Sequence, residues 1–204
     1  MIREIFENSF HSSWPSTVII VITLITVRIA YLNHHRQQVR FYKEFWNLVG
    51  VIYILLLYQL VTKVDLNYMS GVNLVPFKEI LRYDIESEMF LSNVIGNIVL
   101  FIPFGFIIAS YIKPKNMWSN VIIAIIISTT IEFVQLRIGR SFDVDDIILN
   151  TLGCIIGYLL YIGFNAILRH LPNFMKSDWF CNLICIIITI CVVLYILSSM
   201  GIVF

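Results

Sequence analysis

Charged residues are scarce in this sequence. They make up 13% of its 204 residues, about half of the usual share for a soluble domain. Hydrophobic residues make up 59%, and the mean hydropathy is +0.85. A water-soluble chain of this length could not bury so much apolar surface, so the composition predicts an integral membrane protein. Disorder, collagen-like repeats and a disulfide scaffold are excluded.

The sequence also lacks the patterns of several common functional classes. The net charge is only +1, so nothing indicates nucleic-acid binding. The cysteines lie in apolar runs and are interpreted as small buried hydrophobic residues rather than disulfides or metal ligands: Cys154, Cys181, Cys185 and Cys191. No internal repeat, low-complexity tract or second domain is visible, so we expect one integral membrane domain over residues 1–204.

Six apolar runs approach the roughly 20 residues that a helix needs to cross a bilayer. They cover residues 15–32, 45–61, 90–112, 118–136, 147–168 and 179–204. Helices are the expected spanning elements because lipid cannot satisfy the open edge of a sheet. No small-residue cleavage site follows the first run, so we expect a retained span rather than a signal peptide. The predicted fold is an all-α, polytopic bundle of these transmembrane helices.

Basic residues indicate how the spans are oriented. They concentrate in the links after the first, third and fifth spans: His34, His35, Arg36, Arg40, Lys43, Lys113, Lys115, Arg169 and Lys176. The positive-inside rule places these links in the cytoplasm and both termini outside. Within the outer loop 65–89, residues 76–89 carry an apolar stripe among charges, which is typical of an amphipathic segment on the membrane surface. An ordinary connecting loop is the alternative.

Polar residues inside spans cost free energy in hydrocarbon, so they mark candidate functional positions. In the third span, Asn93 and Asn97 lie one helical turn apart and share a face. Gly96 lies between them and should permit the close approach of a neighbouring helix. The two amides belong either to a functional site or to hydrogen bonds that hold helices together.

Two polar residues lie near the end of the fourth span. Glu132 and Gln135 are three residues apart and face the same way. An ionisable residue so close to the apolar run 121–127 needs a partner and by default indicates a functional site. The alternative is an interfacial glutamate in contact with water.

A polar and small-residue stripe begins the fifth span. Its members recur at steps of three and four residues along one helix face: Asp143, Asp146, Asn150, Gly153 and Gly157. Acids at a helix start have a structural alternative, because Asp143 can be the N-cap and Asp145 and Asp146 can interact with the helix dipole. That alternative does not explain Asn150, which lies one turn deeper. The glycines predict close packing against another span.

These polar groups are expected to converge. If the third, fourth and fifth spans pack together, as consecutive helices commonly do, seven side chains meet near the outer surface. They are Asn93, Asn97, Glu132, Gln135, Asp143, Asp146 and Asn150. Arg137 and Arg140 are expected above this cluster, where they can neutralise the carboxylates. The sequence therefore predicts a polar pocket in the outer leaflet.

Four ordered motifs give the sequence a resemblance to the VanZ-like family. They are Asn73-Leu-Val-Pro76-Phe77, Asn93-Val-Ile-Gly96-Asn97 with Phe101-Ile-Pro103-Phe-Gly105, Glu132-Phe-Val-Gln135, and Arg140-Ser-Phe-Asp143-Val-Asp145-Asp146 with Asn150-Thr-Leu-Gly153. The resemblance covers residues 73–158. It implies a multi-pass protein of the bacterial cell membrane, with the motifs on the extracytoplasmic side. The founding member of that family is associated with low-level resistance to teicoplanin, a glycopeptide that carries an acyl chain.

The resemblance implies a phenotype rather than a reaction, and three functions fit the polar cluster. The first is a pocket that binds a membrane lipid, a lipid-linked envelope molecule or a teicoplanin-type acylated glycopeptide. The second is an intramembrane hydrolase or transferase for a lipid-linked substrate, with Glu132 as the general acid or base. The third is a lipid transporter or a proton-coupled transporter.

The expected binding residues combine the polar cluster with one loop residue: Asn73, Asn93, Asn97, Gln135, Arg140, Asp143, Asp146 and Asn150. No metal or other cofactor is expected, although Asp143 and Asp146 could hold a divalent cation. The histidines lie outside the motifs, so a serine mechanism with a Ser/His/Asp set is not expected. The sequence leaves the oligomeric state open.

Overall fold

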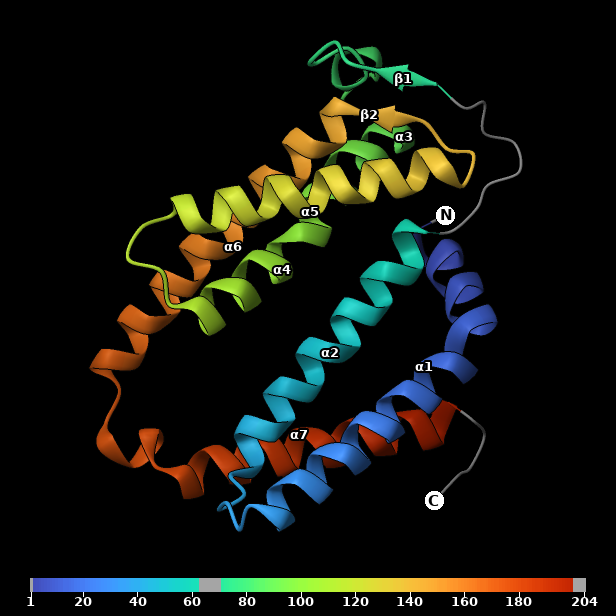
Figure 1. Ribbon diagram of the computed structural model, residues 1–204. Helices are drawn as coiled ribbons and strands as arrows, with labels where there is room; N and C mark the ends of the chain where they lie inside the picture. Colours follow the sequence, from blue (N-terminus) through green and yellow to red (C-terminus); the bar gives the residue numbers. More distant parts are fainter. Residues whose placement is uncertain (1, 63–70, 200–204) are drawn as a thin grey trace. The chain divides into compact units, whose positions relative to one another are not determined.

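A computed structural model describes residues 2–62 and 71–199. For residues 2–15, 196, 197 and 199 it describes the backbone alone. The described chain is helical, and six of its helices are long and apolar enough to cross a membrane (Figure 1), which confirms the predicted all-α, multi-pass fold. The first part of the loop 65–89 and residues 200–204 of the sixth predicted span lie outside the described residues.

The observed helices extend the predicted spans by a few residues at most ends. The long helices are α1 (Ile2–His34), α2 (Phe41–Val61), α4 (Gly96–Ile112), α5 (Trp118–Arg137), α6 (Val144–His170) and α7 (Asp178–Ser199). Shorter elements are β1 (Val72–Asn73), η1 (Ile80–Arg82), α3 (Glu88–Phe90), η2 (Leu91–Ile95), β2 (Phe142–Asp143) and η3 (Asn173–Lys176). The largest difference is at α1, which begins at Ile2 although its apolar span covers Ser16–His34.

The third span is not a uniform α-helix. It starts at α3, where the Ser87 hydroxyl accepts a hydrogen bond from the backbone N–H of Phe90, an N-cap contact. It then passes through η2, which is a π-helix, before continuing as α4. A π-helix inserts extra backbone into the turn and is frequent at functional sites. The span ends at Ile112, because Lys113 takes a left-handed conformation and Pro114 follows it.

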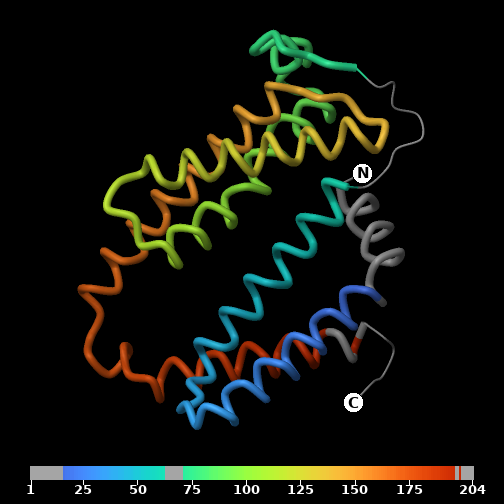
Figure 2. Tube along the Cα trace, in the orientation of Figure 1, coloured from blue at the N-terminus to red at the C-terminus, as the bar shows by residue number. Residues whose placement is uncertain are grey.

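The chain divides into two compact units, which we describe separately. Unit 1 comprises residues 1–14 and 54–165, and unit 2 comprises residues 15–53 and 166–204. Figure 2 traces both units along the Cα positions. Unit 1 contains the end of α2 and the consecutive helices α4 and α5 with most of α6. It therefore contains every motif noted in the sequence.

Glycines bring α4 and α6 into backbone contact within unit 1. A Cβ atom at Gly153 or at Gly157 would collide with a backbone oxygen of α4, and one at Gly105 would collide with the backbone of Cys154. The close packing predicted for Gly153 and Gly157 is confirmed. Gly96 differs, because the nearest atom to its added Cβ would be Leu91 O at 3.7 Å, an ordinary contact. The expectation that Gly96 admits a neighbouring helix is wrong, since it faces the turn of η2.

A short parallel strand pair, which the sequence did not reveal, joins the loop before η1 to the link between α5 and α6. Val72 pairs with Phe142 and Asn73 pairs with Asp143, and Phe142 N donates to Gly71 O at 2.9 Å. Gly139 starts the turn into this link with a φ of 89°, in the left-handed region that favours glycine. This pairing places Asn73 directly beside the start of α6.

The segment 76–89 is partly helical, and its helical parts are short. It holds the three-residue 3₁₀ helix η1 and the start of α3, with turns between them. Phe77 has a φ of 65°, an uncommon conformation for a bulky residue. Leu81 and Ile85 are 81% and 77% exposed, so these two apolar side chains point away from the rest of unit 1.

Unit 2 is held by contacts at its surface. Arg28 of α1 forms a bidentate ion pair with Glu44 of α2, with both N–O distances at 2.9 Å. The backbone N–H of Tyr42 donates to Asn182 Oδ1 of α7 at 2.9 Å. Arg28, the charge that interrupts the first apolar run, is therefore paired.

Candidate functional site

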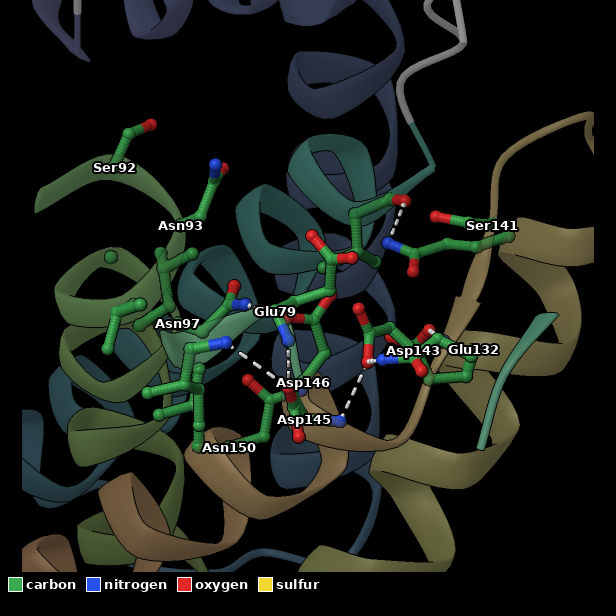
Figure 3. Close-up of a pocket in the computed structure, with 18 of the residues that line it drawn as sticks. Glu79, Ser92, Asn93, Asn97, Glu132, Ser141, Asp143, Asp145, Asp146 and Asn150 are labelled. Carbon is green, nitrogen blue, oxygen red and sulfur yellow. Dashed lines mark hydrogen bonds between the residues drawn. The ribbon is translucent and has the colours of Figure 1, made fainter. Parts of the chain in front are cut away.

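A pocket of about 970 Å³ lies within unit 1. It is lined by the end of α2, by residues 71–73, 78–80, 82 and 83, by the α5–α6 link, and by parts of η2, α4, α5 and α6. All the predicted site residues line it: Asn73, Asn93, Asn97, Glu132, Gln135, Arg140, Asp143, Asp146 and Asn150. Figure 3 shows six of the predicted residues together with Glu79, Ser92, Ser141 and Asp145. The structure thus brings the predicted set to one cavity.

Glu132 is buried against the start of α6. Its side chain is 1% exposed, and Oε2 accepts a hydrogen bond from the backbone N–H of Asp143 at 2.8 Å. The partner that a carboxyl group at this depth requires is therefore a main-chain donor of the α5–α6 link. This contact fixes the end of α5 against β2.

Asp146 links α6 to the third span. Its Oδ1 accepts from Asn97 Nδ2 at 2.6 Å. Asp146 also lies close enough to Glu132 and Asp143 for the three carboxyl groups to interact electrostatically, and Arg140 interacts with Glu132 and with Asp146. Three acidic groups and one guanidinium therefore form the charged part of the pocket around α5, β2 and α6.

Asp143 is an N-cap residue that also lines the pocket. It is the N-cap of α6, since Oδ1 accepts from the backbone N–H of Asp145 at 2.9 Å. The same oxygen accepts from Asn73 Nδ2 at 3.0 Å, which anchors β1. Burial raises the pKa of the Asp143 carboxyl above its ordinary value, while these two hydrogen bonds oppose the rise. Asp143 lines the pocket as well.

Gln135 and Arg140 have a structural contact in common. Gln135 Nε2 and Arg140 Nη1 both donate to Val61 O, at 3.0 and 3.3 Å. That carbonyl belongs to the last residue of α2 and has no partner within the helix. Arg137, which we expected beside Arg140, is exposed and does not line the pocket. The expectation that both arginines stand over the carboxylates is wrong for Arg137, which lies in the last turn of α5 with its side chain exposed.

The amide side chains occupy different depths. Asn93 is exposed on η2, and in Figure 3 it lies with Ser92 at a distance from the acidic residues. Asn150 is 4% exposed, and its Nδ2 donates to Ser128 Oγ of α5 at 2.7 Å. Among the described residues, no hydrogen-bond donor reaches Asn150 Oδ1. Asn93 therefore lies at the rim and Asn150 at the bottom.

Asp145 is the residue that the sequence interpretation missed as part of the site. We assigned it to the helix dipole, but it is 1% exposed and binds three backbone N–H groups of another segment. Oδ1 accepts from Phe77 at 2.5 Å, and Oδ2 accepts from Glu79 at 2.8 Å and from Ile80 at 3.2 Å. Neighbouring backbone donors of this kind form an anion-binding concavity, here filled by the protein's own carboxylate. Asp145 thus holds the segment before η1 over the pocket.

A metal centre is not evident among the described residues. No group of three or more histidine, cysteine, aspartate or glutamate side chains in residues 2–62 and 71–199 is arranged to hold a metal ion. Divalent-cation binding by Asp143 and Asp146 stays a prediction. The described groups that could act chemically are the carboxyl groups of Glu132 and Asp146, with Arg140 beside them.

Comparison with known proteins identifies the family. No curated protein and no solved structure matches the chain. The family model described as VanZ/LLP1 matches residues 45–169, which are more than half of the chain and include the whole lining of the pocket. This multi-pass membrane protein therefore belongs to the VanZ/LLP1 family.

Proposed function

We propose that this protein binds an amphiphilic molecule, a membrane lipid or an acylated ligand, with the polar end in the pocket of unit 1. The observation that carries the proposal is the mixed lining of that pocket. Acidic and amide groups from α4, α5, β2 and α6 share it with apolar side chains of the third span. Ligand sites commonly combine an apolar wall with a few converging polar groups.

The apolar wall continues onto the outer surface of the third span. Leu91, Ile95 and Val99 follow one another at four-residue spacing, and all three line the pocket. They are also 50%, 38% and 54% exposed. A surface of this kind within a spanning segment faces acyl chains. An amphiphile could thus place its headgroup among the polar residues while its chain lies along these three side chains.

The cellular role follows from the orientation and the family resemblance. The positive-inside rule supports an extracytoplasmic pocket, and the family resemblance supports a bacterial cell membrane. There it would meet lipids of the outer leaflet, lipid-linked envelope molecules and acylated glycopeptides. Binding of such molecules would alter how a membrane-anchored antibiotic reaches its target. Low-level resistance to teicoplanin is the phenotype that this proposal predicts.

Drug susceptibility of a sensitive Gram-positive host tests this role. The protein is expressed as wild type, as Asp146→Asn and as Asp84→Asn, with membrane levels matched by immunoblot. Asp84 is the matched control, because it is exposed and does not line the pocket. We expect the wild type and Asp84→Asn to protect against teicoplanin but not vancomycin, which lacks the acyl chain. Protection that survives Asp146→Asn would show that the pocket is not the binding site.

A second candidate is an intramembrane enzyme, favoured by the adjacent carboxyl groups of Glu132 and Asp146 in one pocket. One of them could transfer protons during cleavage of a lipid-linked substrate. An enzyme would produce a changed lipid in extracted membranes, and Glu132→Gln would abolish that change. A binder would show saturable binding and no product.

A further inference from the structure

Around α5, β2 and the start of α6, the carboxyl groups that line the pocket outnumber the basic groups. Glu79 forms an ion pair with Arg82 at 3.1 Å, and Asp145 is satisfied by three backbone N–H groups. Three further carboxyl groups line the pocket on Glu132, Asp143 and Asp146, and one guanidinium, that of Arg140, interacts with the first and the last of them. A carboxyl group removed from water stays ionised only where a positive charge or hydrogen-bond donors stabilise it. A bound cation would supply the missing positive charge.

The bottom of the pocket offers several hydrogen-bond acceptors. Glu132 and Asp146 contribute carboxylate oxygens, and Asn150 contributes Oδ1, which accepts from no described residue although its side chain is only 4% exposed. Asn150 lies one helical turn after Asp146, so both point from the same face of α6. In Figure 3 it lies below Asp146 and Asn97. A primary ammonium has three N–H donors and no acceptor, which matches this set.

A different segment contributes basic side chains to the pocket. Lys78 and Arg82 line it from the loop around η1, which Asp145 holds in place, and Lys78 is exposed. Basic side chains in this position suit a phosphate group. The lining therefore carries acceptors on α5 and α6, cations on the loop, and an apolar wall on the third span.

We infer that the pocket takes a zwitterionic phospholipid whose headgroup carries a primary ammonium, with the ammonium facing Glu132, Asp146 and Asn150 and the phosphate facing the loop of Lys78. This inference rests on the proposed binding of an amphiphile and names its chemical class. Choline headgroups have a cation without N–H donors, and glycerol headgroups have no cation. Both should fit this site less well.

The inference is tested by lipid binding to the purified full-length protein in detergent. The probes are dioctanoyl phosphatidylethanolamine, phosphatidylcholine and phosphatidylglycerol, with free phosphoethanolamine as the headgroup without chains. Binding is measured by calorimetry and by native mass spectrometry. We expect phosphatidylethanolamine to bind about tenfold more tightly than the other two lipids, a difference of about 1.4 kcal/mol. Free phosphoethanolamine should bind more weakly, because it lacks the apolar contacts.

Two conservative variants test which groups select the headgroup. Glu132→Gln and Asp146→Asn keep an oxygen for the protein's own hydrogen bonds but remove the charge. Each should weaken phosphatidylethanolamine binding about tenfold. Phosphatidylglycerol binding should not weaken, because its headgroup has no ammonium for the carboxylate to pair with. Glu86→Gln and Asp84→Asn are exposed and outside the pocket, so they serve as matched controls without effect.

The outcomes separate this inference from the proposed function. Equal binding of all three lipids, weakened together by Asn97→Leu, would overturn the ammonium headgroup and leave the amphiphile pocket standing. Selective binding that neither charge-removing variant reduces would overturn the assignment to Glu132 and Asp146. Free phosphoethanolamine binding as tightly as the lipid would point to a soluble ligand and overturn the phospholipid. No saturable binding of any lipid would overturn the proposed function itself.

Discussion

The two units of this protein differ in whether their polar residues are buried. The described polar and charged residues that are buried all belong to unit 1: Asn120, Ser128, Glu132, Gln135, Asp145 and Asn150. The described ion pairs of unit 2 are at exposed or half-buried positions, as in Arg40–Asp178, where both side chains are nearly half exposed. Buried polar groups must be satisfied, whereas exposed pairs contribute little to stability.

This difference indicates where the chain tolerates change and where it does not. In unit 1, buried polar side chains join separate elements, as Asn120 of α5 does by donating to Gly105 O of α4 at 3.0 Å. Such networks specify one arrangement of helices, because a broken member leaves its partner unsatisfied. Unit 2 relies on apolar helix surfaces and surface contacts. We therefore expect substitutions in unit 1 to have the larger effects.

The largest effect is expected at Asp145. Asp145→Ala removes the acceptor of three backbone N–H groups, and hydrogen bonds to a charged group contribute about 1.5–3 kcal/mol each. The free energy of unfolding should fall by about 3 kcal/mol or more. Asp145→Asn should lower it nearly as far, because one amide oxygen replaces two carboxylate oxygens. The measurement is thermal unfolding in detergent. If Asp145→Ala lowers the stability no more than an exposed control such as Asp84→Ala does, Asp145 does not anchor the loop.

The next largest effect on stability is expected at the glycine contact between α4 and α6. Gly157→Ala places a Cβ atom against the backbone of α4 at Ile102 and Phe106. Overpacking of this kind costs about 1–3 kcal/mol. Gly163→Ala, on the same helix, has open space around the added atom and should be neutral or slightly stabilising. Equal unfolding temperatures for the two variants would show that the helices separate without cost.

Asp143 should show a smaller effect that depends on pH. Asp143→Asn keeps an oxygen for both of its hydrogen bonds, whereas Asp143→Ala loses the N-cap, at a cost of about 1 kcal/mol. Burial raises the folded-state pKa of Asp143 above its reference of 3.8. The folded state therefore holds this proton more tightly, and stability falls as pH rises from about 4 through the folded-state pKa.

The pH dependence distinguishes the amide variant from the wild type. An asparagine side chain cannot ionise, so the stability of Asp143→Asn relative to wild type should increase as pH rises over that window. Unfolding temperatures measured from about pH 4 to about pH 8 test this. A relative stability that declines with rising pH would mean that the Asp143 carboxylate is stabilised by its surroundings.

The spans and the pocket residues were predictable because their signals are local. Long apolar runs fix the helices, and a polar residue within such a run stands out at once, as Glu132 does. The role of Asp145 was not predictable, since it depends on three N–H groups of a loop 65 to 68 positions away. The β1–β2 pair and the π-helix η2 are equally hidden, because tertiary contacts rather than residue pattern decide them. Gly96 and Gly157 look alike in sequence, yet packing against another helix distinguishes them.

The smallest effect is expected in unit 2, and it offers the sharpest way to break the comparison between the units. Arg28→Leu with Glu44→Leu removes both partners of a half-exposed pair, so no charge is left without its counterpart. The unfolding temperature of this double variant should change less than that of Asp145→Ala, Gly157→Ala or Asp143→Ala. Glu44→Leu alone should lower it more, because Arg28 would then be an unpaired charge in an apolar span. If the double variant is as unstable as Asp145→Ala, surface pairs contribute as much as buried networks, and the contrast between the two units fails.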